Sequence, residues 1–182
     1  DKGNIHIIDK EDIGIILDDA FLPELLKIND INKIMKNIYQ NWDETLFYQY
    51  LQRFNLTNNL LIKSLSKGMK KKLEIAVSLA HKPKLLILDE PTSGLDPIVR
   101  GEVLDIFREF MESDDHSILI SSHITSDLES IADYIALLHQ GKLIFKESIT
   151  NIMDNYGIIH CTKEMFEKLK DNAVSYRKNK YD

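Results

Sequence analysis

The sequence predicts an α/β fold, in which strands and helices form a core and a further set of helices is inserted into it. A strand is expected at residues 84–88, because a continuous apolar run follows Lys84 and is followed by two acids, which is typical of a strand buried on both faces of a parallel sheet. From residue 81 onward, short apolar runs alternate with helical patterns, as in α/β cores. Between residues 20 and 80 the apolar residues recur at helical spacing instead. The sequence therefore predicts an α/β core with an inserted α-helical lobe.

The first eighty residues predict two short strands and then the helices of the lobe. The strands are expected at Asn4 to Asp9 and Ile13 to Leu17, on either side of a polar turn. Two apolar faces predict the first two helices: Ile28, Ile31, Ile34, Met35 and Ile38 on one, and Leu46, Phe47, Tyr50, Leu51 and Phe54 on the other. The second helix is expected to start at Asn41 or Asp43. A third helix is expected over residues 66–80, and its first residue, a serine, can cap it.

Helices and strands alternate beyond the apolar run. A helix is predicted over residues 96–111 because the segment opens with Asp-Pro and carries an apolar stripe. A strand is expected at residues 117–121, followed by a short helix that Ser126 and Glu129 open with a capping-box pattern. The remaining predicted elements are a hairpin of residues 134–138 and 143–145, and helices near residues 149–156 and 164–169. The predicted organisation is a core of residues 1–19 and 81–160, a helical lobe of residues 20–80 and a C-terminal extension of residues 161–182.

Composition and charge argue against several classes of protein. The 182 residues carry a net charge of -6, whereas general nucleic-acid binding needs clustered Lys and Arg. Cys161 is the single cysteine, so neither an intrachain disulfide nor a cysteine zinc site can form within the chain. No apolar run reaches the length of a bilayer span, and residues 1–20 contain no signal-peptide pattern. We therefore expect a cytoplasmic protein, without a nucleic-acid partner, that meets a membrane only through another protein.

Asp89 and Glu90 follow the apolar run and are the first candidates for chemistry. A carboxylate at the end of such a strand can reach a magnesium ion that bridges nucleotide phosphates, and this is the role expected of Asp89. Because the adjacent carboxylate points in another direction, Glu90 can orient or deprotonate a water that attacks a γ-phosphate. The ordinary alternative is that Asp-Glu-Pro simply ends a strand.

Two motifs on either side of one helix-length stretch change the balance between these interpretations. They are Leu-Ser-Lys-Gly-Met at residues 65–69 and Leu-Leu-Ile-Leu-Asp-Glu-Pro-Thr-Ser-Gly-Leu-Asp at residues 85–96. Together they resemble the signature motif, the magnesium-and-base strand and the D-loop of ATP-binding-cassette (ABC) ATPases. The resemblance covers nearly all of residues 1–145 and implies a P-loop NTPase-type core. A G-x-x-x-x-G-K-[ST] phosphate loop does not occur in the 182 residues, so the front end of such a core is missing from them.

The resemblance assigns expected roles to the signature segment. Ser66 and Gly68 match positions that approach the γ-phosphate bound by the opposite subunit, and a helix N-terminus suits that role because its free N–H groups attract anions. Ser66 can equally be an ordinary helix cap. Lys67 replaces the first glycine of the family motif and Met69 replaces its glutamine. We expect Lys67 to add positive potential near a phosphate, and residues 70–72, all lysines, to form a solvated face.

Three further residues match family positions. His123 resembles the switch histidine that contacts the γ-phosphate, although a lone histidine would ordinarily be structural. Asp96 resembles the D-loop aspartate at the dimer interface, and it can also cap the helix that follows. Asp18 stands where the family usually has the Q-loop glutamine. A carboxylate there can bind magnesium, but it can equally belong to a helix-capping turn.

The resemblance implies the ATPase subunit of an ABC transporter, most similar to bacterial antibiotic or peptide export systems with a separate permease. ATP and Mg²⁺ would bind between two head-to-tail copies, and the subunit would lie on the inner face of the cell membrane through the permease. One alternative is a non-transport ABC protein of DNA repair or of ribosomes; another is a regulatory module that does not hydrolyse ATP. Without a phosphate loop, the 182 residues alone are expected to hydrolyse ATP negligibly. The surface formed by residues 18–23 and the first helix of the lobe is expected to dock a cytoplasmic helix of the permease, with Phe21, Leu22 and Leu25 as apolar anchors; the alternative is that these three residues are buried in the lobe.

Overall fold

The computed structural model describes residues 9–18, 22–173, 175 and 177. It divides into two compact units, residues 1–131 and residues 132–182, and each is described by itself. Residues 4–8 of the first predicted strand lie outside the described residues. Asp9 caps a 3-10 turn, Lys10–Asp12, by accepting a hydrogen bond from the Glu11 amide.

Unit 1 is built on a parallel sheet of three strands. They are β1 (Ile13–Ile16), β2 (Leu85–Asp89) and β3 (Ser117–Ser121), in the order β1-β2-β3. The register pairs Ile16 with Leu88 and Asp89 with Ser121, so all three strands end at the same edge. The predicted α/β fold with a parallel sheet is confirmed.

The sheet is not equally covered on its two faces in the described residues. Successive side chains of a strand alternate between the faces, and Ile16, Leu86 and Leu88 are almost fully buried. On the opposite face Ile15 is 55% exposed and Leu119 is 64% exposed. In β2 itself, Leu85 and Ile87 on that face are half-buried, so the predicted burial of the central strand on both faces is complete on one face and partial on the other, as far as the described residues go.

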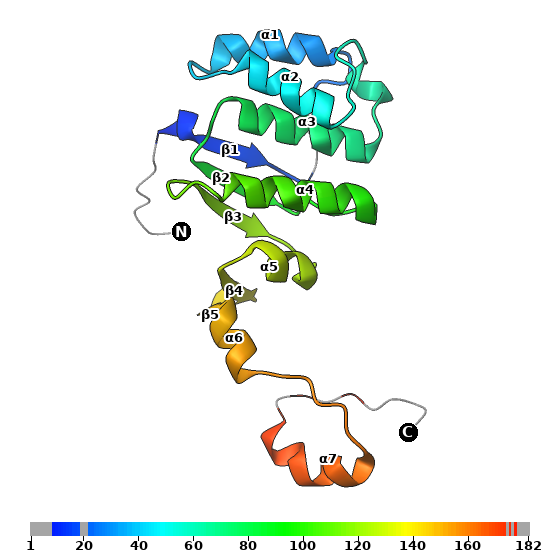
Figure 1. Cartoon of the computed structure of the whole chain (residues 1–182), viewed down its shortest axis with the longest axis vertical. Helices are drawn as coiled ribbons and strands as arrows, with labels where there is room; N and C mark the ends of the chain where they lie inside the picture. The colour runs from blue at the N-terminus through cyan, green and yellow to red at the C-terminus, as the bar shows by residue number, and fades with distance from the viewer. Residues whose placement is uncertain (1–8, 19–21, 174, 176, 178–182) are drawn as a thin grey trace. The chain divides into compact units, whose positions relative to one another are not determined.

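The lobe consists of three helices beside the sheet: α1 (Ile28–Ile38), α2 (Glu44–Arg53) and α3 (Lys67–Ala80), with a 3-10 turn at Ile62–Ser64. Figure 1 shows α1 and α2 next to α3, which in turn contacts β1. The predicted start at Ser66 is confirmed, and of the two starts expected for the second helix the structure has Asp43; these side chains accept hydrogen bonds from the amides of Met69 and Leu46. The predicted stripe of α1 is only half buried, because Ile38 is 59% exposed.

Two helices follow the strands that carry the site. They are α4 (Pro97–Phe110) and α5 (Thr125–Ile131). The predicted capping box at Ser126 is wrong: α5 begins one residue earlier, and the Ser126 hydroxyl instead accepts a hydrogen bond from Arg100 Nη2 at 2.7 Å. The first turn of α5 is therefore organised by a contact with α4, which local sequence cannot show.

Unit 2 begins with the predicted hairpin. Strands β4 (Tyr134–His139) and β5 (Lys142–Ser148) are antiparallel and joined by Gln140 and Gly141, both with positive φ, as a tight two-residue turn requires. Helices α6 (Ile149–Asn155) and α7 (Lys163–Leu169) and a 3-10 turn at Lys170–Asn172 follow. None of the helices in the described part of the chain has the length and apolar character needed to cross a membrane.

Candidate functional site

The carboxyl ends of β2 and β3 bring Asp89 and Ser121 together. The two residues are paired in the sheet register, and Ser121 Oγ donates a hydrogen bond to Asp89 Oδ1. Asp89 is exposed, whereas Leu88 before it is buried. The strand thus delivers a solvent-facing carboxylate to the edge of the sheet where α/β proteins bind their ligands.

Glu90 adopts a left-handed backbone conformation, with φ of 47°. Such a conformation costs about 1–3 kcal/mol for a residue other than glycine and persists only where neighbouring contacts enforce it. Here the Glu90 amide donates to Ser121 O at 3.0 Å, and its carbonyl accepts from the Ser93 amide at 3.1 Å. The chain therefore turns sharply after Asp89, and the two neighbouring carboxylates leave the strand in different directions.

His123 contacts Glu90 although 33 residues separate them in the sequence. Its Nδ1 lies 2.6 Å from Glu90 Oε2. An ionised carboxylate only accepts hydrogen bonds, so the proton of this contact belongs to His123 Nδ1. The side chains of His123 and Glu90 are 69% and 24% exposed, so the pair is open to a substrate. A catalytic acid-base pair has this combination of short contact and access.

A buried polar cluster lies behind the Glu90–His123 pair. The Thr92 hydroxyl donates to Asp127 Oδ2 at 2.6 Å, and Arg100 Nε donates to Asp127 Oδ1 at 2.6 Å. Thr92 and Asp127 are each 1% exposed. Sequence reasoning missed this cluster. Only a weak indication of it is present in the sequence, namely an aspartate at position 127, four residues after His123. The helix around that aspartate was predicted from its capping pattern alone.

The signature segment packs against the loop that leads into α4. A Cβ atom on Gly94, which has φ of 67°, would lie only 2.8 Å from Lys67 Nζ, so the Lys67 side chain extends over Gly94. Gly68 faces Leu95 and Val99, which an added Cβ would meet at 3.8 to 3.9 Å. The structure thus brings the predicted residues of the signature segment and of the D-loop into one neighbourhood at the N-terminus of α3.

Asp96 and Asp18 occupy different positions. Asp96 caps α4, since its Oδ1 accepts hydrogen bonds from the amides of Ile98 and Val99, both at 3.1 Å. Asp18 is exposed and follows β1 by two residues, at the same edge as Asp89. Within the described residues, no three His, Cys, Asp or Glu side chains gather as a metal site. Any magnesium role of Asp18 with Asp89 remains a proposal.

The lysine run of the signature helix is not a solvated face, which corrects the prediction for residues 70–72. Lys71 is 2% exposed; its Nζ donates to Leu17 O at 2.6 Å and lies 3.2 Å from Glu74 Oε2. Lys72 is largely buried and forms an ion pair with Glu102. A run of lysines does not by itself predict this burial, because the apolar stem of a lysine packs on apolar surface whether its ammonium group is buried or exposed.

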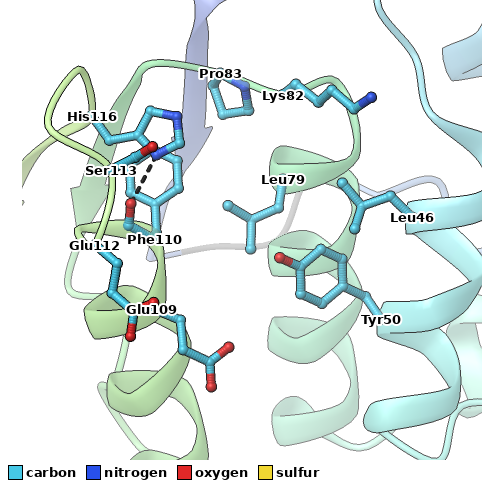
Figure 2. A pocket seen from close by; sticks show the side chains of 10 residues that line it. All are labelled: Leu46, Tyr50, Leu79, Lys82, Pro83, Glu109, Phe110, Glu112, Ser113 and His116. Atoms are coloured by element: carbon cyan, nitrogen blue, oxygen red, sulfur yellow. Dashed lines mark hydrogen bonds between the residues drawn. The ribbon is translucent and has the colours of Figure 1, made fainter.

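A cavity of about 390 Å³ lies between α2 and the C-terminal ends of α3 and α4, and none of the candidate site residues lines it. Figure 2 shows Leu79 and Tyr50 on one side of it and Phe110 and Glu109 on the other. Its wall includes Pro83 and His116, which precede β2 and β3. The cavity is therefore at the amino edge of the strands, opposite the edge that carries Asp89 and Glu90.

Comparison with known proteins identifies the family. Residues 4–93 match the ABC transporter family ABC_tran. The chain is 34% identical over 174 residues to the lantibiotic transport ATP-binding protein SrtF of Streptococcus pyogenes, covering 94% of this chain and 70% of the relative. The chain belongs to the ABC transporter ATP-binding proteins. A second relative of this family, the bacitracin transport ATP-binding protein BcrA of Bacillus licheniformis, is 45% identical over 84 residues, which are 46% of this chain and 28% of the relative.

A solved structure supports the same family assignment. The fold is similar to a structure described as the ATP-binding subunit of an ABC transporter, with a TM-score of 0.71 and 26% identity. The similarity covers 88% of this chain and 69% of that one. The predicted resemblance to ABC ATPases is confirmed, and membership of this ATPase family implies nucleotide binding. The roles of the individual residues are proposals.

Proposed function

We propose that this chain is the hydrolytic part of an ABC transporter ATPase subunit that powers a separate membrane permease. The observation that carries the proposal is the Glu90–His123 contact beside Asp89 at the ligand-binding edge of the sheet. SrtF and BcrA are named for lantibiotic and bacitracin transport, which supports a peptide or antibiotic as cargo. The subunit then lies on the inner face of the cell membrane, held there by the permease.

Glu90 is the general base in this proposal. Its carboxylate takes a proton from the water that attacks the γ-phosphate, while His123 donates a hydrogen bond to the phosphate or to that water. Glu90 and His123 are already in contact, and the imidazole is exposed. To reach a bound γ-phosphate, His123 therefore needs only to reorient its imidazole. Hydrolysis by the 182 residues alone is expected to be negligible, since their sequence holds no phosphate loop.

Asp89 is the proposed magnesium ligand. Magnesium in nucleotide sites keeps several waters and takes one or two carboxylates in addition to the phosphates. A single exposed carboxylate at the end of β2, oriented by the Ser121 hydroxyl, fits that requirement, and Asp18 beyond β1 is the candidate second acid. When bound, the ion neutralises charge on the β- and γ-phosphates.

The signature segment completes the ATP site of a second copy of the subunit. Ser66 and Gly68 lie at the N-terminus of α3, a 14-residue helix whose first amides and dipole attract phosphate oxygens. Lys67 adds a positive charge there, and Asp96 lies in the adjoining loop. ATP then joins two head-to-tail copies, and hydrolysis separates them.

Association of the full-length subunit tests this proposal. Sedimentation should show a monomer without nucleotide and a dimer with Mg²⁺ and a non-hydrolysable ATP analogue. Gly68→Glu should prevent the dimer but leave nucleotide binding by the monomer, because the substitution places a negative charge where the phosphate of the other copy is bound. Gly157→Glu is the matched control, since that glycine has open space around it and lies in unit 2. A Gly68→Glu protein that dimerises like the wild type would rule out the signature role.

A further inference from the structure

The turn that carries Glu90 and the segment that carries His123 are joined a second time by buried groups. Thr92 lies two residues after Glu90, and Asp127 lies four residues after His123. Their side chains meet through the 2.6 Å hydrogen bond between Thr92 Oγ1 and Asp127 Oδ2. The surface pair and the buried pair therefore connect the same two segments at different depths.

Arg100 extends this connection to α4. Its Nε donates to Asp127 Oδ1, its Nη2 forms an ion pair with the same oxygen, and Nη2 also donates to the Ser126 hydroxyl. Both oxygens of the Asp127 carboxylate are thus bonded. A buried carboxylate with a cation and a hydroxyl as partners holds its neighbours in fixed geometry, since losing either partner leaves an unsatisfied group.

We propose that Thr92, Asp127 and Arg100 form a clamp of positioning residues that sets the distance between Glu90 and His123 for ATP hydrolysis. The inference rests on the proposed function of that pair. None of the three residues needs to touch ATP. A displacement of a reacting group by about 1 Å can cost roughly 100-fold in rate, so a loosened clamp lowers kcat more than ATP affinity.

Two substitutions in the full-length subunit test the clamp. Thr92→Val keeps the shape of the side chain but removes the hydroxyl, whereas Thr92→Ser keeps the hydroxyl. We expect Thr92→Val to lower kcat at least about 10-fold with KM for ATP changed less than about 2-fold, and Thr92→Ser to retain most of the wild-type kcat. Thr57→Val, at an exposed position of the lobe, is the matched control. If Thr92→Val does not fold, Arg100→Lys takes its place in the test. This substitution keeps the charge but loses the forked contact with Asp127 and Ser126.

Nitrogen NMR of the His123 imidazole distinguishes an effect of the clamp on the position of His123 from a loss of stability and from a failure of the proposed function. In the wild type, Nδ1 should be protonated and bonded to Glu90, and Thr92→Val should weaken that signature at temperatures well below melting. Unchanged His123 resonances together with unchanged kcat in Thr92→Val would overturn the clamp, even if Glu90 is the base. If Glu90 is instead dispensable for turnover, altered His123 resonances in Thr92→Val would show that the clamp sets the geometry of the pair, but its role in hydrolysis would fail together with the proposed function.

Discussion

At the scale of single residues, the proposed chemistry depends on a glutamate held in an unusual conformation. The Glu90 backbone is fixed by hydrogen bonds to Ser121 and Ser93, and its carboxylate contacts His123. Ser121 and His123 lie at or just beyond the end of β3, more than 30 residues further along the chain than Glu90, so the site forms only when β2 and β3 are paired. The carboxylate is consequently positioned before a substrate arrives, which reduces the reorganisation needed in the reaction.

Replacement of His123 by alanine should damage catalysis without damaging the fold. The imidazole is 69% exposed and its described contact is with Glu90, so its removal leaves no cavity in the core. In the full-length subunit we expect kcat to fall about 100-fold or more, in the range of acid-base contributions, with the melting temperature within about 2 °C of the wild type. Equal loss of stability and activity would instead favour a structural histidine.

His81 should make the stability of the fold depend on pH. The side chain is buried against Tyr39, and its Nε2 lies 3.1 Å from Ile13 O. Burial lowers the pKa of His81, although the backbone of Ile13 and Val77 and the carboxylates of Glu11 and Asp12 oppose the shift. Since the folded state resists protonation of His81, the unfolded state binds more protons as the pH falls below 6.5, the ordinary pKa of a histidine.

The free energy of unfolding should therefore fall as the pH drops below about 6.5, by up to about 1.4 kcal/mol per pH unit, until the folded-state pKa is reached. His81→Gln, which keeps a donor but cannot titrate, should flatten this dependence in urea unfolding between pH 7 and pH 5. His139→Gln, at an exposed position, is the control. Parallel curves for the wild type and His81→Gln would exclude His81 as the source.

Some residues of the site were predictable and others were not. Asp89, Glu90 and His123 were predicted because they lie at or just beyond the ends of strands and match a family pattern in order and spacing. Lys71 was predicted to be solvated because three adjacent lysines on a helix usually are. The structure buries it because Leu17, directly after β1, offers a carbonyl oxygen as acceptor, and that contact spans 54 residues.

At the scale of elements, Lys71 ties the signature helix to the end of β1. Its Nζ donates to the carbonyl oxygens of Leu17 and Asp18, and Glu74 lies one turn away on the same helix. Burial raises the pKa of Glu74, and the positive charge of Lys71 opposes that shift. The position of α3 is thereby coupled to the segment that carries Asp18.

Lys71→Met should destabilise unit 1 by about 3–5 kcal/mol, because it leaves the buried Glu74 without its cation. Lys70→Met removes a neighbouring ion pair whose partner, Glu24, is 66% exposed, and it should cost less than about 1 kcal/mol. Urea unfolding measures both. Because isosteric apolar pairs can replace buried ion pairs, Lys71→Met with Glu74→Met should recover much of the loss. Equal effects of Lys71→Met and Lys70→Met would contradict the buried coupling.

The segment before α1 is the proposed docking site for a permease. Phe21 lies outside the described residues, Leu22 is half-buried and Leu25 is 80% exposed. Leu25→Ser should therefore reduce co-purification with the membrane subunit several-fold while leaving the melting temperature unchanged. Ile158→Ser, at an apolar position of unit 2 that is 89% exposed, is the control. Undiminished co-purification of Leu25→Ser would place the docking surface elsewhere.

Helix and strand positions were predictable where local chemistry sets them. Asp43, Ser66 and Asp96 each cap a helix through their own side chains; the starts at Ser66 and Asp96 were predicted, and Asp43 was one of the two starts expected for its helix. The start of α5 was not, because Ser126 bonds Arg100 instead of capping the helix. An N-cap can be recognised in sequence only when no distant group competes for the same hydroxyl.

At the scale of the whole molecule, the order of the strands creates the site. The parallel arrangement β1-β2-β3 brings Asp18, Asp89 and Ser121 to one edge, although they are far apart in sequence. The alternation of strands and helices predicted this fold. It could not predict that Ile15 and Leu119 are exposed on the other face, because the apolar content of a strand does not show which of its faces is covered.

Turnover by Glu90→Gln in the full-length subunit tests the central claim most directly. The amide keeps the size of the side chain but cannot accept the proton of the attacking water, so kcat should fall at least about 100-fold while ATP binding and the melting temperature stay at wild-type values. Glu112→Gln, an exposed acid after α4, is the matched control and should hydrolyse ATP normally. Wild-type turnover by Glu90→Gln, measured beside that control, would contradict the assignment of the catalytic base and with it the account of the site.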